Sequence, residues 1–331
     1  KKKPIKIYHP DRKTIPFVFA SPHSGRDYPD DFVNASQLDP VRLRRSEDSF
    51  VDELFACVPD VGAPLLAARY PRAYVDPNRE AYELDPDMFD EPLPGYVTKN
   101  SVRVSAGLGT IARVVTNGEE IYRHKLTFAE VKWRIESVYR PYHAALERLI
   151  SETKEAFGKC ILVDCHSMPS TGGPLEDDTD RKGVDIVLGN NHGTTCAPEL
   201  INFVDERLTG LGLRVRRNNP YSGGYTTRHY GRPRQNVHTL QIEINRALYM
   251  DEVTIQKHEG FADLAGKIST LLHGLNEFIS ANGTISINVK AIELQILRSR
   301  KRLRPPAPFP PRIFLDKNRR GIGETQSEHT T

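Results

Sequence analysis

The sequence has no long hydrophobic run and little cysteine. No stretch reaches the roughly 18 apolar residues that a membrane-spanning helix needs, and the basic N-terminus, KKKPIKIYHPDRK, lacks the apolar core of a signal peptide. The four cysteines (Cys57, Cys160, Cys165 and Cys196) form no C-x-x-C pair. In a chain of this size that pattern is typical of buried free thiols in a reducing compartment. We therefore expect a cytoplasmic protein with no disulfide framework and no membrane span.

Several common catalytic motifs are also absent. The sequence contains no G-x-S-x-G, no Walker loop, no G-x-G-x-x-G and no internal repeat. Ser24 and Ser167 each stand beside a histidine, but without the elbow motif nothing supports a serine nucleophile. These absences argue against a serine hydrolase of the elbow type, a P-loop enzyme and a dinucleotide-binding protein.

Positive charge is concentrated at one end of the chain. The formal net charge is +3, but residues 298–331 hold nine Lys/Arg and three Asp/Glu, a net of +6, so the rest of the chain is at −3. A nucleic-acid-binding fold is therefore not expected, and nonspecific contact with nucleic acid is expected only of the tail. We predict a catalytic domain over residues 1–284 and a disordered, basic, Pro/Arg-rich tail over 285–331.

Apolar runs alternate with helical patterns between these ends. Strands are predicted over 15–21, within 63–76, and over 159–167, 183–193 and 239–250. Helices are predicted over 46–58 (capped by Ser46), 127–158 (broken or kinked at Pro141), 197–212 and 254–280, and residues 83–112 read as a long Pro- and Gly-rich excursion. Alternation of this kind indicates an α/β sandwich around a largely parallel sheet.

Titratable groups stand where three of the predicted strands end. The first strand leads into His23, the second carries Asp164 and His166, and the last carries Glu243. Ligands bind beyond the carboxyl ends of strands in open α/β sheets. Two histidines and one carboxylate are a usual protein ligand set for a catalytic zinc ion, and the carboxylate is expected from Glu47 or Asp48. Taken singly, either histidine is more simply read as a loop residue that makes a hydrogen bond.

Glu243 lies on the polar face of its strand. Alternation in LQIEIN places Leu240, Ile242 and Ile244 on one face and Gln241 and Glu243 on the other. A carboxylate beside an activated water can act as a general base and later return the proton to a leaving amine. The alternative for Glu243 is an ion pair with a nearby arginine.

Arginines mark three further polar clusters. Asn78 and Arg79 follow a predicted strand, Tyr225 and Arg228 lie in a loop with a Gly pair that could close on an anion, and Arg246 follows the last strand. A guanidinium holds a carboxylate through two parallel hydrogen bonds. These clusters favour a small anionic substrate, although each alone fits an ordinary surface turn.

Five separated segments together resemble one known family. SPHSGRDYP, RRSEDSFVDELF, RYPRAYVDPNRE, VDCHSMPS and GGYTTRHYG…VHTLQIEINRALYMDE, spread over residues 15–275, are similar in order and spacing to the N-formylglutamate amidohydrolases. The resemblance implies an eight-stranded mixed sheet between layers of helices, like that of the zinc carboxypeptidases. It also implies zinc-dependent hydrolysis of N-formylglutamate to formate and glutamate, a last step of histidine degradation.

The resemblance also implies roles for individual residues. His23, Asp48 and His166 would bind Zn²⁺ or another divalent metal, and Glu243 would be the general base. Asn78 and Arg79 would hold the α-carboxylate, with Arg79 and Arg246 fixing the two carboxylates of the substrate and Arg228 stabilising the oxyanion. The family pattern has a histidine where this chain has Phe50, so the resemblance leaves the exact acyl or side-chain preference open. The alternatives are an amidase for another N-acyl amino acid, peptide or cell-wall amide, and a non-catalytic protein that binds an acidic metabolite.

Overall fold

A seven-stranded mixed sheet forms the centre of the protein, which we describe from a computed structural model over residues 3–171 and 183–281. The strand order is β1-β3-β2-β4-β7-β5-β6, and β8 and β9 form a separate ribbon. The strands are β1 Ile5–Tyr8, β2 Phe17–Ser21, β3 Leu65–Ala68, β4 Cys160–Met168, β5 Ile186–Gly189, β6 Val215–Arg217, β7 Val237–Asn245, β8 Met250–Asp251 and β9 Gln256–Lys257.

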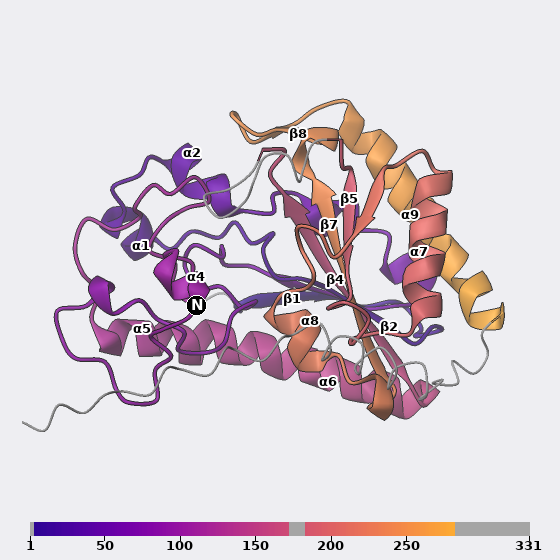
Figure 1. Cartoon of the computed structure of the whole chain (residues 1–331), viewed down its shortest axis with the longest axis horizontal. Helices are drawn as coiled ribbons and strands as arrows, with labels where there is room; N and C mark the ends of the chain where they lie inside the picture. The colour runs from indigo at the N-terminus through magenta and orange to yellow at the C-terminus, as the bar shows by residue number, and fades with distance from the viewer. Residues whose placement is uncertain (1–2, 172–182, 282–331) are drawn as a thin grey trace, which may run out of the picture.

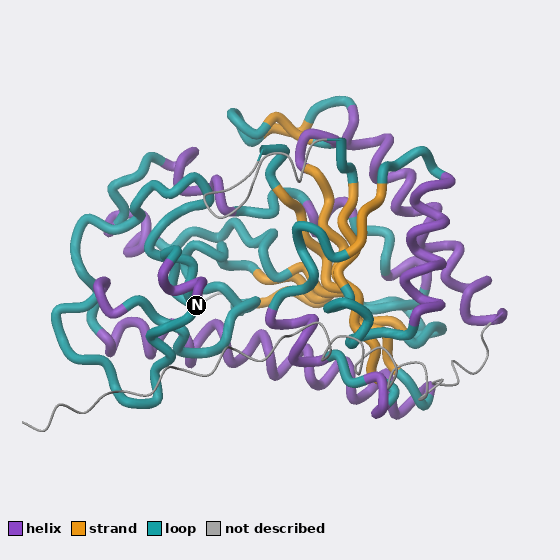
Figure 2. Tube along the Cα trace, viewed as in Figure 1, coloured by secondary structure: helices purple, strands orange, loops and turns teal. Residues whose placement is uncertain are grey.

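Helices cover both faces of the sheet, as Figures 1 and 2 show. The helices are α1 Asp30–Ala35, α2 Pro40–Leu43, α3 Val51–Leu54, α4 Val102–Ser105, α5 Phe128–Arg134, α6 Arg140–Phe157, α7 Pro198–Gly210, α8 Tyr225–Tyr230 and α9 Gly260–Ala281. Alternation along β2 explains the two layers: Phe17 and Phe19 belong to the core shared with α3, α7 and α9, whereas Val18 and Ala20 pack with α6. The predicted three-layer α/β sandwich is confirmed.

The parallel strands β3, β2, β4 and β7 bring the predicted site residues to one edge. β2 and β4 are parallel, and β4 and β7 are parallel with His166 opposite Glu243. β1 is antiparallel to β3, and β5 is antiparallel to β7, so the sheet is mixed. The expected eighth strand is not found among the described residues, where the sheet has seven strands.

A third hydrophobic cluster is formed by residues between Phe32 and Tyr139, in the part of the chain that carries α1, α2, α4 and α5 and includes the excursion 83–112. These helices lie to one side of the sheet in Figure 1. Arg134 is the buried centre of this cluster: the guanidinium lies 4.4 Å from the centre of the Tyr74 ring and donates a hydrogen bond to the Tyr122 hydroxyl at 2.8 Å. The predicted helix 127–158 is continuous through a π-helical turn, Ile135–Tyr139, with Pro141 in the first turn of α6. The excursion is therefore packed on the body as one wall of the pocket described below.

Two predicted elements differ from the structure. The helix predicted over 46–58 is reduced to Val51–Leu54, and Ser46 does not cap it but accepts a hydrogen bond from the Thr116 backbone N–H. The predicted strand 239–250 ends at Asn245, whose side chain accepts from the Ala247 N–H. At Asn245 the side chain bonds to a local backbone group, which competes with the strand, whereas Ser46 is taken up by a backbone group distant along the chain and so does not cap a helix.

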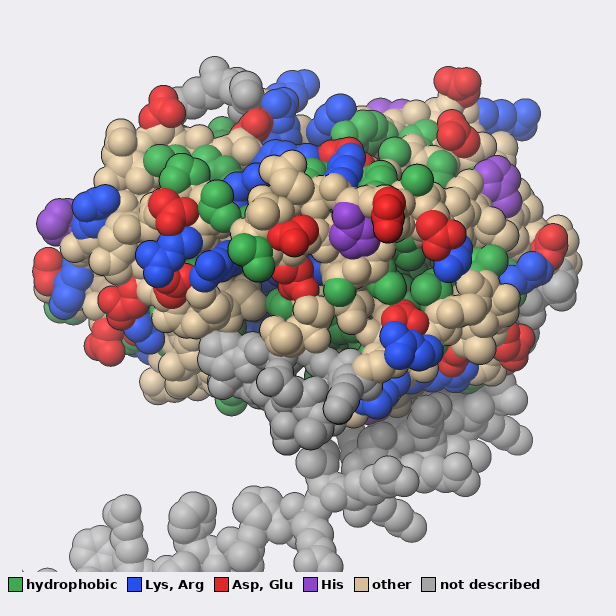
Figure 3. Space-filling model, turned by 90° about the horizontal axis from the view of Figure 1, so that it is seen from above, with side chains coloured by type: hydrophobic (Ala, Val, Ile, Leu, Met, Phe, Trp, Pro, Cys, Tyr) green, Lys and Arg blue, Asp and Glu red, His purple; other side chains and the backbone are tan. Residues whose placement is uncertain are grey.

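Among the described residues, none of the helices has the length and apolarity to cross a membrane. Acidic and basic side chains are interspersed over much of the face in Figure 3. The tail predicted over 285–331, its disorder and the domain boundary at 284 lie outside the described residues and stay predictions.

Candidate active site at the carboxyl edge of the sheet

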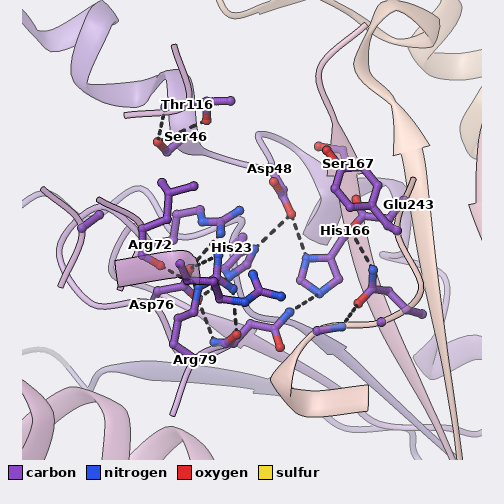
Figure 4. A pocket seen from close by; sticks show the side chains of 18 of the residues that line it. His23, Ser46, Asp48, Arg72, Asp76, Arg79, Thr116, His166, Ser167 and Glu243 are labelled. Carbon is purple, nitrogen blue, oxygen red and sulfur yellow. Dashed lines mark hydrogen bonds and ion pairs between the residues drawn. The ribbon is translucent and has the colours of Figure 1, made fainter. Parts of the chain in front are cut away.

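A pocket of about 300 Å³ opens at the carboxyl ends of β2, β4 and β7. β4 and β7 contribute residues, and so do the loops after β2, after β3 and before α8. Figure 4 shows the labelled side chains of this pocket pointing toward one another. The pocket is lined by residues that include His23, Asp48, Arg72, Asp76, Asn78, Arg79, Arg103, His166, Arg228, Gln241, Glu243 and Arg246.

Three buried side chains meet at the base of this pocket. One ligand atom from each of His23, Asp48 and His166 lies within 4.8 Å of the other two. The Asp48 Oδ2 is 3.0 Å from His166 Nδ1 and 3.4 Å from His23 Nδ1. Both imidazoles therefore present the same nitrogen to the same carboxylate, although the residues are far apart in the sequence.

The backbone around Asp48 determines which acidic residue reaches the histidines. Its N–H donates to the carbonyl of His23 at 3.0 Å, and Phe50 turns the chain with φ of 66° before α3 begins. Glu47 points elsewhere, because its carboxylate accepts from the Tyr28 hydroxyl at 2.7 Å and from Arg44 at 3.0 Å. Of the two carboxylates that the sequence leaves open, Asp48 is the one in the cluster.

Each histidine is held from behind by a second carboxylate. His23 Nε2 lies 2.7 Å from Asp76 Oδ1, and His166 Nε2 lies 3.0 Å from Asp164 Oδ1. A carboxylate on the far ring nitrogen fixes the tautomer and aims the near nitrogen at a metal. The site thus has an inner set of ligands and an outer set of carboxylates.

Electrostatics favour positive charge among these groups. Burial alone would lower the pKa of His166, but Asp164 and Asp48 outweigh it and raise that pKa well above its usual value. Burial alone would raise the pKa of Asp48, but the hydrogen bond with His166 and the nearby His23 ring hold it well below its usual value. Burial likewise opposes ionisation of Asp76, whose pKa the Arg72 and Arg79 charges hold well below normal.

These residues fit a divalent metal ion. His23 Nδ1 is buried and has no hydrogen-bond partner, although it points at Asp48. An orphaned buried nitrogen is unfavourable unless something else binds it. Two imidazole nitrogens and a carboxylate oxygen are a usual protein donor set for catalytic zinc, so the cluster is compatible with a divalent cation.

Glu243 lies beside this cluster on the neighbouring strand. It is paired with His166 in the β4–β7 register and is 8% exposed. Gln241, on the same face of β7, donates to Glu243 Oε1 at 2.9 Å. Burial raises the pKa of Glu243 to about 7. A carboxyl group with this pKa can both accept and return a proton near neutral pH.

Asn78 is fixed between α8 and the histidines. Its Oδ1 accepts from the Thr226 N–H at 2.8 Å, and its Nδ2 lies 3.2 Å from His166 Nε2. Gly224 permits this packing, since a Cβ there would lie 2.3 Å from Asn78 Nδ2. One donor group of Asn78 therefore stays close to the centre of the site.

The predicted arginines line the pocket and differ in the number of hydrogen bonds that they make to the protein. Arg246 is committed to Asp48 Oδ1 at 3.0 Å, to the carbonyl of Arg45 at 3.1 Å and to the Ser167 hydroxyl at 3.2 Å. Arg79 donates to the carbonyls of Leu108 and Asn78. Arg228 donates from Nη1 to the Gly223 carbonyl at 2.9 Å.

The prediction of a loop around Tyr225 is partly wrong. Residues 225–230 form helix α8, and Tyr225 lines an adjoining pocket of about 210 Å³ together with Asn78, Arg79, Arg103 and Arg228, not the pocket of the histidines. Phe50 does not line the histidine pocket either. Its ring faces Arg26 and Lys257, at 5.4 and 5.1 Å from its centre.

Sequence reasoning missed Asp76, Arg72 and Arg103. Asp76 comes two residues before Asn78 in the segment YVDPNRE, so its position beside a polar cluster was a usable signal. Arg72 lies one turn before Asp76 and pairs with it at 2.8 Å. Arg103 lies in the excursion, where no strand end marks it.

Fold and site together define an α/β protein with a buried His/carboxylate cluster at the carboxyl edge of its sheet. The chain belongs to the N-formylglutamate amidohydrolase family, whose model matches residues 15–250. It is 31% identical to the N-formylglutamate deformylase of Pseudomonas putida over 72% of this chain and 83% of that protein. It is 30% identical to the N-formylglutamate deformylase of Pseudomonas aeruginosa over 82% of this chain and 95% of that protein.

Solved structures agree with this assignment. The N-formylglutamate amidohydrolase of Ralstonia eutropha is 37% identical, with a TM-score of 0.76 over 85% of this chain and all of that one. A protein of Agrobacterium tumefaciens matches with a TM-score of 0.58 over 84% of this chain and 97% of that one, and at 20% identity it supports the fold alone.

Proposed function

We propose that this protein hydrolyses the formamide bond of N-formyl-L-glutamate and releases formate and L-glutamate. The observation that carries the proposal is the juxtaposition of the His23/Asp48/His166 cluster with Glu243 in one arginine-lined pocket. Membership of the family and the names of its relatives support the substrate. Arginine on several sides of the pocket suits a substrate with two carboxylates.

The cluster would hold a divalent cation, for which zinc is our first choice. His23 and His166 would contribute their Nδ1 atoms and Asp48 its Oδ2, with Asp76 and Asp164 orienting the two rings. When bound, the cation would supply Lewis acidity toward water and the amide carbonyl.

Glu243 would transfer the protons of the reaction. As a carboxylate it takes a proton from the attacking water, and the resulting hydroxide oxygen bonds to the formyl carbon. The protonated carboxyl then gives that proton to the amine as the C–N bond breaks. Gln241 holds Oε1, which leaves Oε2 to face the reacting atoms. We assign Arg228 to the oxyanion of the addition step.

Asn78 and Arg79 would hold the α-carboxylate, and Arg246 would serve two purposes. The Asn78 amide lies 3.2 Å from His166 Nε2 and lines the same pocket as the cluster and its neighbour Arg79, which suits the carboxylate attached to the carbon that bears the formamide. Arg246 lines the pocket and would contact a substrate carboxylate there, and through its bond to Asp48 it would also orient a ligand of the cluster.

The cysteines are in keeping with a reducing compartment. Cys160, Cys165 and Cys196 are buried free thiols and Cys57 is half-buried and free, which supports our proposal of a cytoplasmic enzyme. No disulfide contributes to the described fold.

The decisive experiment combines metal analysis with product detection. We expect the purified protein to contain about one divalent ion per chain and to release formate from N-formyl-L-glutamate. Chelation should abolish release, and added zinc should restore it. A parallel panel of N-acetyl-L-glutamate, N-formyl-L-aspartate and a peptide amide tests the related amidase activities. Binding of N-formylglutamate without formate release, in metal-loaded protein, would overturn the proposal in favour of a non-catalytic binding protein.

A further inference from the structure

The pocket contains one arginine with no assigned task. Five arginines of the described part of the chain line it: Arg72, Arg79, Arg103, Arg228 and Arg246. Four of them donate to a carboxylate or a carbonyl of the protein. Over residues 3–171 and 183–281, the Arg103 guanidinium makes no hydrogen bond and no ion pair, although it is only partly exposed.

The segment that carries Arg103 is firmly anchored. Ser101 caps α4 by accepting from the Val104 N–H at 3.0 Å, and its hydroxyl also bonds to Glu83. Farther along, the Thr110 carbonyl accepts from the Asp76 N–H at 2.8 Å, and the Leu108 carbonyl accepts from Arg79. The free guanidinium is therefore held at the pocket wall by a fixed backbone, which lowers the entropic cost of binding a ligand.

Positive charge at this wall exceeds the negative charge beside it. Burial, followed by repulsion from Arg228, lowers the pKa of Arg103. Burial also lowers the pKa of Arg79 to about 9, and Arg103 adds to that shift against the attraction of Asp76. A bound anion would offset this repulsion.

The residues that line the two pockets indicate which anion Arg103 would bind. Arg103 lines both the histidine pocket and the adjoining pocket, whereas His23, His166 and Glu243 line only the former. Asn78, Arg79 and Arg228 line both pockets as well, but each of these side chains already bonds to other groups of the protein. With Asn78 and Arg79 assigned to the α-carboxylate and Arg228 to the oxyanion, Arg103 is left for the side-chain carboxylate.

We propose that Arg103 binds the side-chain carboxylate of the substrate and so determines the preference for glutamate. This inference rests on the proposed function, which it deepens: it names a specificity residue for the same site. The side-chain carboxylate would accept hydrogen bonds from a guanidinium that has no hydrogen bond or ion pair within residues 3–171 and 183–281.

The test compares substrates that differ only in one carboxylate. N-formyl-L-glutamine lacks the side-chain charge, and N-formyl-L-isoglutamine lacks the α-charge. In Arg103→Met we expect kcat/KM for N-formyl-L-glutamate to fall about 10- to 100-fold, mostly through KM, the range for one lost bond to a charged group. The value for N-formyl-L-glutamine should be essentially unchanged, so that the variant no longer discriminates between the two.

Two further variants complete the design. Arg103→Lys keeps the charge without the bidentate fork and should retain part of the discrimination. Arg148→Met, on the exposed side of α6, removes a matched arginine outside the site and should leave all three values unchanged. If Arg103→Met discriminates between glutamate and glutamine substrates as the wild type does, or loses instead the discrimination against isoglutamine, the assignment is overturned.

Binding of the products separates this inference from the proposed function. Calorimetry of metal-loaded protein with L-glutamate and L-glutamine needs no turnover. Wild-type protein should prefer glutamate, and Arg103→Met should lose that preference. If N-formylglutamate is not hydrolysed but the Arg103-dependent preference is present, the proposed activity fails and the specificity site stands. If hydrolysis proceeds and the preference does not depend on Arg103, the specificity site fails alone.

Discussion

At the scale of single residues, each histidine of the site lies between two carboxylates. His23 and His166 each have one ring nitrogen toward Asp48 and the other toward an outer carboxylate. Asp48 is itself held by Arg246. Because every group in the cluster is buried, removing one partner leaves another unsatisfied, which makes each contact testable.

Glu243→Gln should abolish turnover and leave the metal in place. Glutamine has the same shape but cannot take a proton from water, and Glu243 is outside the ligand cluster. We expect kcat to fall by about 10² to 10⁴, the usual contribution of a general base, with unchanged metal content by elemental analysis.

Glu206→Gln, on the exposed surface of α7, is the matched control. Normal hydrolysis by the Glu243 variant would show that another group is the base. Loss of metal from it would instead place Glu243 among the ligands.

Asp76→Asn should weaken metal binding without removing a ligand. Asp76 holds His23 Nε2 and also accepts from the Asn78 N–H at 2.8 Å. Loss of an orienting carboxylate typically costs about 10- to 100-fold in metal affinity, which competition with a chelator would measure. Asp60→Asn, at an exposed position, controls for the change of charge. Equal affinity in the two variants would rule out this role for Asp76.

At the scale of elements, short loops and helices do most of the positioning. α8 supplies the Thr226 N–H that fixes Asn78, and the turn at Phe50 directs residue 48 to the histidines. α6 connects these parts through His143, whose Nε2 is 2.9 Å from the Pro77 carbonyl and whose Nδ1 is 2.7 Å from the Tyr230 hydroxyl. The neutral ring satisfies both contacts, donating from Nε2 and accepting at Nδ1.

His143 should lower the free energy of unfolding in acid. Burial lowers the pKa of His143 from 6.5 to about 4. Between these values the unfolded chain binds the proton and the folded chain does not, so stability is complete above pH 6.5 and declines as pH falls toward 4. At pH 5 the loss from this one group is about 2 kcal/mol.

His143→Gln retains a donor and an acceptor but does not titrate. Urea unfolding at pH 7.5 and pH 5 should show a smaller difference for this variant than for the wild type, by about the same 2 kcal/mol. An identical pH dependence in both proteins would show that His143 does not carry the effect.

At the scale of the whole molecule, charge is divided between two parts of the chain. Residues 298–331 are at +6, and the family match ends at residue 250. The described fold closes with α9 at Ala281. Among the described residues, those that form the pocket, the cluster and the seven-stranded sheet all lie at or before Arg246.

A chain that ends at residue 284 should therefore keep its metal, its thermal stability and its hydrolytic rate. If the tail contacts nucleic acid, the full chain should bind DNA in a manner that weakens steeply with salt, and the shortened chain should not. Formate release and DNA binding are measured on both chains. A shortened chain that unfolds or loses hydrolysis would show that the boundary at 284 is wrong.

The sequence by itself determined the alternation of strands and helices, the face that Glu243 occupies and the strand ends at which His23 and His166 appear. These follow from local periodicity, and parallel strands must bring their carboxyl ends to the same edge. Tertiary structure alone decided that Asp48 rather than Glu47 meets the histidines, that residues 46–50 are not helical, and that Asp76 and Arg103 belong to the pocket. Those outcomes depend on backbone turns and on partners distant along the chain, whose contacts outweigh local helix propensity.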